Sequence, residues 1–327
     1  MKKLELLLIF FLLTSRILFP GNTKDPIVLK NGQDYLETLI DNGIYCKLIQ
    51  DIEYDSGSLY LLDSQLCLVF VVDLKTGKLI RTLFRRGQGP NELMMPMSIK
   101  VRNSKVFVLD QGFNGIKICD IEGKPVKEFK TSGMIGRRNI DVNDKNEIFA
   151  AEYNSQNNTY VTVYTWQGEK KHSLVKIGSG NKLDLQRSSY KVLIDSEGNI
   201  LLLFPVLREL KKFSPNGEML WETRIKNKLL DKKDADEDGV KVTDKGAIHT
   251  KISVFDFIIT KSNNIIIGHA YGGCIIDKNG NFTNLITFEP IGALFLFKIA
   301  GDKIINGFGP RILNLYDIDI KIKEVFK

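Results

Sequence analysis

The stretch that decides the fold is KICDIEGKPVKEF, residues 117–129, because its pattern returns elsewhere in the chain. It consists of a short alternating apolar run, a turn that contains Gly123 and a second alternating run. Alternation with period two is typical of β-strands, and a glycine between two such runs is typical of a hairpin turn. The stretch KKFSPNGEMLWET, residues 211–223, repeats this pattern. The sequence therefore predicts a hairpin that the chain uses more than once.

Aligned on its glycine, the hairpin recurs at intervals of about 45 residues, with a longer interval before the last glycine. The glycines are Gly77, Gly123, Gly168, Gly217 and Gly280. A sixth copy, LYDIDIKIKEVF at residues 315–326, lacks the glycine. Two further short apolar runs precede a typical hairpin, such as MSIKV and KVFVLD before Gly123. Each repeat unit is therefore predicted to hold four short strands.

A period near 45 residues with four strands in each unit indicates a β-propeller, in which one repeat forms one blade. We predict an all-β fold, a six-bladed β-propeller with four antiparallel strands per blade, over residues 43–327. A pair of β-sandwiches does not account for six recurrences of the same pattern. A helical solenoid is excluded because the chain lacks long stretches of helical period after its first twenty residues.

Two stretches carry a resemblance to a known family. VFVLDQGFNGIKICDIEGKPV, residues 106–126, resembles an NHL repeat, and RRGQGPNELMMPMSIKV, residues 85–101, is similar to the glycine-rich linker between blades in that family and in the six-bladed propellers of exported bacterial proteins. The resemblance extends over residues 49–327. It implies the propeller fold and no specific activity, because this architecture supports many unrelated functions.

The N-terminal residues have the layout of a secretory signal, with Lys2 and Lys3 before an apolar run. We therefore expect residues 1–21 to be a signal peptide, or an uncleaved anchor, and the protein to be exported to the periplasm, the cell surface or the medium. Residues 22–42 form a separate N-terminal segment. Within it the apolar run at residues 26–30 is expected to close the ring, on the final blade or beside it.

Topology predicts which face of the propeller binds a ligand. If the strands of a blade are named A to D from the axis outward, the B-to-C loops and the D-to-A linkers share one face, and the glycine hairpins lie on the other. The loop-rich face includes an insertion at residues 226–252. Long loops on a rigid scaffold commonly carry binding sites, and guanidinium groups suit carboxylate and phosphate ligands. The predicted ligand-binding residues on this face are Arg85, Arg86, Arg137, Arg138, Arg187, Arg208, His269 and Arg311.

The alternative interpretation of these arginines is structural. They would then pair with Asp63, Asp110, Glu152 and Glu92 and lock neighbouring blades together.

These patterns favour a binding or scaffolding module that recognises a protein or an anionic ligand. The formal net charge of +7 permits anionic partners, and nucleic acid is not expected for an exported protein. The alternative is a metal-dependent propeller hydrolase or lyase with an axial site, similar to lactonase-type and amidating-lyase propellers. Its metal would be held at the ends of the B strands, at residues that include Asp63, Asp110, Glu152 and His269.

Two further expectations concern metals and cysteines. Asp234, Asp236 and Asp238 precede Gly239 in the manner of a calcium loop, although Lys245 stands where the closing acid belongs, so any calcium site should be weak. Calcium is thus a possible cofactor. The four cysteines lack C-x-x-C spacing, and we expect them to be buried apolar residues without disulfides.

Overall fold

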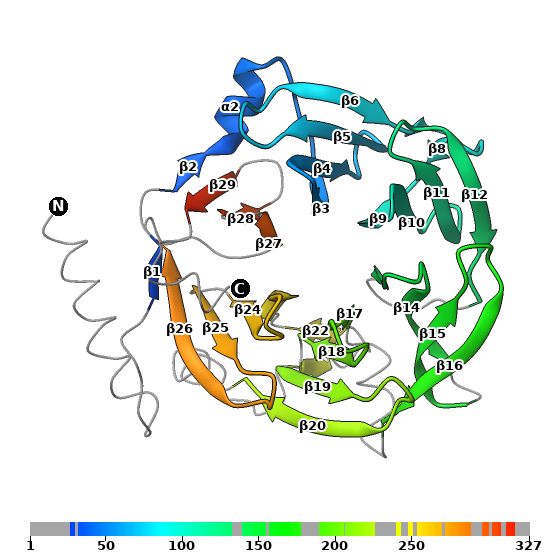
Figure 1. Cartoon of the computed structure of the whole chain (residues 1–327), viewed down its shortest axis with the longest axis vertical. Helices are drawn as coiled ribbons and strands as arrows, with labels where there is room; N and C mark the ends of the chain where they lie inside the picture. Colours follow the sequence, from blue (N-terminus) through cyan, green and yellow to red (C-terminus); the bar gives the residue numbers. More distant parts are fainter. Residues whose placement is uncertain are drawn as a thin grey trace, which may run out of the picture.

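The computed structural model describes residues 27–29, 32–132, 139–154, 157–177, 190–205, 207–225, 240–242, 248–250, 254–269, 272–288, 296–300, 303–308 and 312–317. Its strands form six blades around a central axis, and this arrangement confirms the predicted six-bladed β-propeller (Figure 1). The four strands of each blade are antiparallel to their neighbours. In each of blades 1 to 5 the first strand in the sequence lies innermost.

The strands of the blades have the following bounds. Blade 1 contains β3 (Ile49–Asp55), β4 (Ser58–Asp63), β5 (Leu68–Asp73) and β6 (Leu79–Leu83). Blade 2 contains β9 (Pro96–Arg102), β10 (Lys105–Asp110), β11 (Gly115–Asp120) and β12 (Pro125–Lys130). Blade 3 contains β13 (Ile140–Val142), β14 (Ile148–Asn154), β15 (Thr159–Tyr164) and β16 (Lys170–Lys176).

The second half of the ring follows the same plan. Blade 4 contains β17 (Lys191–Ile194), β18 (Ile200–Phe204), β19 (Glu209–Phe213) and β20 (Met219–Arg224). Blade 5 contains β23 (Val254–Ile259), β24 (Ile265–His269), β25 (Gly272–Ile276) and β26 (Phe282–Phe288). Blade 6 contains β27 (Leu296–Ala300), β28 (Lys303–Phe308) and β29 (Ile312–Asp317), and its fourth strand is β2 (Gln33–Asp34).

The five glycines of the repeat lie in the hairpins between the two outer strands of blades 1 to 5, and all have positive φ. In four of these turns the glycine N–H donates to the carbonyl of the residue three positions earlier. At Gly217 a side chain would also collide with the preceding blade, because a Cβ there would lie 2.9 Å from the backbone nitrogen of Val175. The glycine of this turn is therefore required both by its backbone conformation and by the packing of blades.

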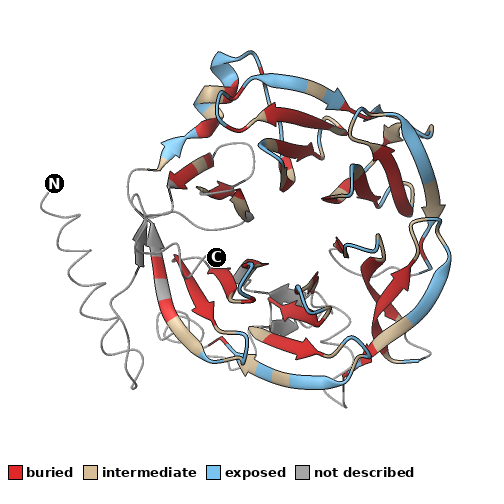
Figure 2. Ribbon diagram, viewed as in Figure 1, coloured by how far each residue is buried: buried red, intermediate tan, exposed pale blue. Residues whose placement is uncertain are grey.

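The core lies between the faces of adjacent blades. Between blades 1 and 2, for example, Leu62 and Val69 pack with Ile99 and Val106, and all four are fully buried. Burial falls off towards the outermost strands, which carry most of the exposed residues of the blades (Figure 2). Strands β4 and β10 are buried along nearly their whole length, because adjacent blades cover both sides of the sheet.

The N-terminal segment joins blade 6 to blade 1 through what we call the clasp, residues 33–41, formed by β2 and the helix α2 (Tyr35–Asp41). Strand β2 pairs with β29 and so completes blade 6. Tyr35 and Leu39 of α2 are buried in a cluster that includes Leu59 of blade 1 and Leu313 of blade 6. Burial of this shared apolar surface closes the ring.

Just before the clasp, β1 (Ile27–Leu29) lies against a different blade from β2. It pairs parallel with β26 at the outer edge of blade 5. The described residues 27–29 of the apolar run thus add an outer strand to blade 5, whereas the strand that pairs with the final blade is β2.

In the insertion, β21 (Val240–Val242) pairs with β22 (Ile248–Thr250). The four cysteines carry free thiols; Cys67, Cys119 and Cys274 are buried. None of the helices in the described ranges has the length and apolar character that a membrane span requires.

Candidate functional site

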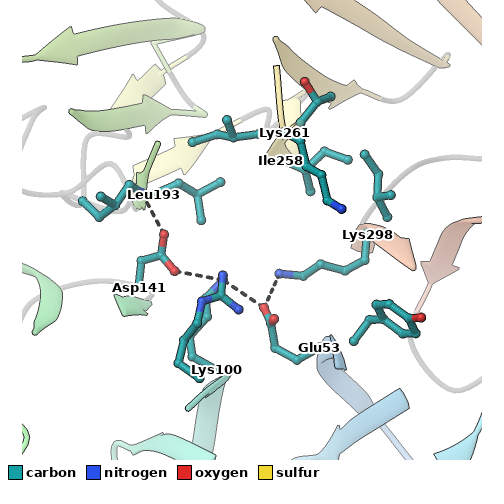
Figure 3. A pocket seen from close by; sticks show the side chains of 13 residues that line it. Glu53, Lys100, Asp141, Leu193, Ile258, Lys261 and Lys298 are labelled. Atoms are coloured by element: carbon teal, nitrogen blue, oxygen red, sulfur yellow. Dashed lines mark hydrogen bonds and ion pairs between the residues drawn. The ribbon is translucent and has the colours of Figure 1, made fainter. Parts of the chain in front are cut away.

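A cavity of about 430 Å³ lies where the innermost strands of all six blades meet. Figure 3 shows this axial cavity from close by. We define it by its lining residues, which are Glu53, Tyr54, Lys100, Arg102, Asp141, Leu193, Ile194, Ile258, Ile259, Thr260, Lys261, Lys298 and Ile299. Its volume is within the range of sites that bind small molecules.

The strand register shows towards which face the cavity lies. In blade 1, Ile49 at the start of β3 pairs with Asp63 beside the B-to-C turn, and Asp55 at its end pairs with Ser58 across the A-to-B turn. The lining residue Arg102 ends β9, and Lys261 lies in the turn after β23. The mouth of the cavity is therefore at the end of the axis where the A-to-B turns lie, opposite to the loop-rich face.

One side of the cavity carries a network of buried charges centred on Glu53. The Oε1 atom of Glu53 accepts hydrogen bonds from Nζ of Lys100 and Nζ of Lys298, each at 2.9 Å. Lys100 also lies 3.4 Å from Oδ1 of Asp141. Figure 3 shows these four side chains converging from β3, β9, β13 and β27. The network thus connects the innermost strands of blades 6, 1, 2 and 3.

Two members of this network, Glu53 and Lys298, have strongly shifted pKa values. Burial alone would raise the pKa of Glu53, but the positive charges of Lys100, Lys298 and Arg102 lower it to about 2. Burial opposes the charged form of Lys298 as well, yet the carboxylates of Glu53 and Asp51 raise the pKa of this lysine well above its ordinary value. Both groups remain charged over the physiological range.

Two carboxylates hold the inner strands at a fixed spacing. Oδ2 of Asp51 accepts from the backbone N–H of Ile99 in the next blade at 3.0 Å, and Oδ2 of Asp141 accepts from the backbone N–H of Ile194 at 2.7 Å. Each contact runs from the innermost strand of one blade to that of its neighbour. The charged side of the cavity is therefore positioned by the backbone as well as by ion pairs.

The other side of the cavity is apolar. Leu193 of β17 and Ile258 of β23 line it, and Leu193 also belongs to the apolar cluster between blades 4 and 5. In Figure 3 these two residues lie across the cavity from Glu53, with Lys261 beside Ile258. The cavity thus has one wall with the ionic network and one wall on which Leu193 and Ile258 lie near the cation Lys261.

Three of the arginines predicted to bind a ligand lie in the described ranges, and each is engaged in the fold. Nε of Arg85 pairs with Glu92 at 2.8 Å, although 80% of the Arg85 side chain is exposed. Arg86 donates to the carbonyl of Gln65 in the B-to-C turn of blade 1. Arg208 occupies the last position of the corresponding turn of blade 4 with positive φ, and it too has a bonding partner.

The side chains of the other predicted residues lie outside the described part of the chain. Arg137, Arg138, Arg187 and Arg311 lie outside the described residues, and so do the calcium-loop residues Asp234, Asp236 and Asp238. His269 ends β24, and its side chain is not described. Ligand binding by these residues and calcium binding by the loop stay predictions.

The carboxylates at the ends of the B strands hold backbone and hydroxyl groups. Asp63 accepts from the N–H groups of Lys47 and Leu48 in the segment before β3, and Asp110 accepts from those of Met94 and Met95 in the segment before β9. Each carboxylate therefore attaches the start of a blade to its own B-to-C turn.

Glu152 instead accepts from hydroxyl groups, at 2.8 Å from Tyr164 and 3.3 Å from Ser132. Among the described residues no three His, Cys, Asp or Glu side chains are grouped as a metal site would require.

The lining residues of the axial cavity were not among the residues predicted from the sequence. A signal for one strand was present, since Ser98, Lys100 and Arg102 alternate with apolar residues in β9. Polar residues at alternate positions of a predicted innermost strand indicate a polar axis in a propeller. The pairing of Glu53 with Lys298, 245 residues away, had no local signal.

Comparison with known proteins gives the following matches. The sequence profile of a family described as 6-bladed beta-propeller matches residues 35–267. No curated protein matches the sequence significantly. The fold is similar to virginiamycin B lyase from Staphylococcus aureus, with a TM-score of 0.55, 12% identity and coverage of 84% of this chain and 85% of that chain.

A second similar structure is a streptogramin B lyase, with a TM-score of 0.53, 10% identity and coverage of 82% of this chain and 78% of that chain. At these identities the likeness concerns the fold alone.

Proposed function

Since this chain belongs to the family of six-bladed β-propellers, whose fold leaves the activity open, we propose from its axial cavity that it is a module that binds a small molecule there. The observation that carries the proposal is the ionic network of Glu53, Lys100 and Lys298 on one wall of the cavity. Groups that transfer protons in catalysis titrate near the working pH. Glu53, with a pKa of about 2, is instead a fixed charge suited to orienting a ligand.

We also propose that the protein is exported, and the support for this is the apolar run after Lys2 and Lys3. The predicted loop-rich face remains a second possible contact surface for a protein partner, and such a contact does not compete with a ligand at the opposite end of the axis.

The proposal is tested by filling the cavity. Leu193→Trp places a larger side chain against the lining, and Val126→Trp adds the same side chain at an exposed position of β12 as a control. Isothermal titration calorimetry with phosphate, citrate, phenylacetate and the neutral phenylacetamide should show that the wild type and Val126→Trp bind at least one of these probes and that Leu193→Trp does not. Circular dichroism checks that the variants are folded.

Absence of binding by the wild type to every probe, or equal binding by Leu193→Trp, would reject the proposal. Elemental analysis of the purified protein separates it from the alternative, a metal-dependent hydrolase or lyase. A stoichiometric divalent metal whose removal abolishes turnover of an ester or lactone would favour the enzyme.

A further inference from the structure

We infer that the ligand of the axial cavity is a small acid that carries a carboxylate or phosphate group, and that Arg102 and Lys261 hold this oxyanion at the mouth. The inference rests on the proposed binding function and specifies the class of ligand. It follows from a difference between the four cationic side chains that line the cavity, which are Lys100, Arg102, Lys261 and Lys298.

Two of these cations are already neutralised within the fold. Lys100 has Glu53 at 2.9 Å and Asp141 at 3.4 Å. Lys298 has Glu53 at 2.9 Å and Asp51 at 4.0 Å. The side chains of Lys100 and Lys298 are 6% and 15% exposed. Both ammonium groups are therefore buried against their own carboxylate partners and are poorly placed to bind an incoming anion.

The other two cations are available. Arg102 donates to the carbonyl of Val101 at 2.8 Å, and no carboxylate in the described part of the chain lies within 4.0 Å of its guanidinium. Lys261 is exposed and likewise pairs with no carboxylate of the described residues. In the described part of the chain neither cation is therefore in direct contact with a carboxylate, although the charge of Arg102 helps to lower the pKa of Glu53.

The fold places these two cations on opposite sides of the mouth. Arg102 ends the innermost strand of blade 2, and Lys261 follows the innermost strand of blade 5. Blades 2 and 5 face one another in a ring of six. An oxyanion at the mouth can thus accept two hydrogen bonds from the guanidinium of Arg102. It is also attracted by the positive charge of the Lys261 ammonium group.

The interior of the cavity determines how the acid is oriented. In the deeper part of the cavity Lys100 and Lys298 are paired with Glu53, so that an anion finds no unpaired cation among the described residues there. Leu193 and Ile258 offer an apolar wall there. The acid should therefore leave its oxyanion at the mouth and direct its apolar part inward, within a volume of about 430 Å³.

The test compares phenylacetate with the isosteric neutral phenylacetamide by calorimetry on the full chain. We expect the wild type to bind phenylacetate about tenfold or more tightly than the amide, and Arg102→Gln and Lys261→Gln each to remove most of this preference, because a hydrogen bond to a charged group contributes about that factor. Lys78→Gln is the matched control, since it removes the same charge from an exposed hairpin on the same face. It should leave both affinities unchanged.

The outcomes separate the inference from the proposed function. If phenylacetamide binds as tightly as phenylacetate and both lose their binding in Leu193→Trp, the acidic class of the ligand is rejected. The proposal that the cavity binds a small molecule then still holds. Equal weakening by Lys78→Gln and Arg102→Gln also rejects the inference, because it shows attraction to the whole surface and not to the mouth. If the wild type binds none of phosphate, citrate, phenylacetate and phenylacetamide, both the inference and the proposed function are rejected.

Discussion

The clasp and the axial cavity both join residues from opposite ends of the chain, but they do so by opposite means. In the clasp, Tyr35 and Leu39 bury apolar surface against blades 1 and 6. In the cavity, Glu53 of blade 1 meets Lys298 of blade 6 through an ion pair. The same seam between the last blade and the first is therefore apolar at its outer part and charged at the axis.

This difference indicates which part of the seam stabilises the fold. Burial of apolar surface contributes directly to the free energy of unfolding. A buried ion pair must first overcome the desolvation of both charges, so that its net contribution is small or negative compared with an apolar replacement. We therefore assign closure of the ring to the clasp, and we propose that the charged cavity serves the binding of a ligand.

The largest expected effect comes from removing one partner of the network. Glu53→Gln leaves Lys100 and Lys298 without their shared carboxylate, and we expect a loss of about 3–5 kcal/mol in the free energy of unfolding. Urea denaturation measures this loss. A loss below about 1 kcal/mol would mean that Asp141 and Asp51 alone compensate the charges of Lys100 and Lys298 and that Glu53 is not the centre of the network.

The same variant has a defined dependence on pH. Folding lowers the pKa of Glu53 from 4.5 to about 2, so its contribution is complete above pH 4.5 and is lost as the pH falls towards 2. The stability difference between wild type and Glu53→Gln should therefore shrink over this range. Urea denaturation at several pH values checks the sign, and a difference that grows on acidification would contradict it.

The second effect concerns the clasp. Leu39→Ala empties a fully buried position in α2 and should lower the free energy of unfolding by about 2–5 kcal/mol. Ile40→Ala is the matched control, because Ile40 is the next residue of the same helix and is 44% exposed; its effect should stay within about 0.5 kcal/mol. Similar effects of the two variants in thermal and urea unfolding would show that the helix does not pack into the seam.

A smaller effect is expected at the start of the same helix. Asp34 caps α2 by accepting from the N–H groups of Leu36 at 3.0 Å and Glu37 at 3.2 Å. Asp34→Ala should cost about 0.5–2 kcal/mol, and Asp34→Ser should recover most of it because serine also caps helices. If the serine variant is no more stable than the alanine variant in urea denaturation, the cap does not contribute.

The parts of the fold that depend on local physics could be predicted from the sequence. The glycine hairpins were predictable because positive φ leaves glycine as the preferred residue and because alternation marks the flanking strands. Strand β2 was not, since the two residues Gln33 and Asp34 carry no strand pattern and pair only because β29 offers a free edge.

The candidate site was harder to predict for a related reason. Arginine in a loop suggests a binding role at once, whereas Arg85 and Arg86 prove to contact Glu92 and Gln65. In the sequence Glu53 and Lys298 cannot be told from ordinary surface residues, because they become neighbours only when the ring closes. A site made of one residue from each of several blades is set by closure of the ring and not by any motif.

The most direct measurement of the central claim is a crystal structure of the protein with 4-iodophenylacetate, in which the anomalous scattering of iodine locates the ligand. We predict an iodine peak in the axial cavity beside Leu193 and Ile258, with the carboxylate at the mouth between Arg102 and Lys261. An iodine peak on the loop-rich face, or a cavity without ligand in crystals that contain the acid elsewhere, would contradict the account.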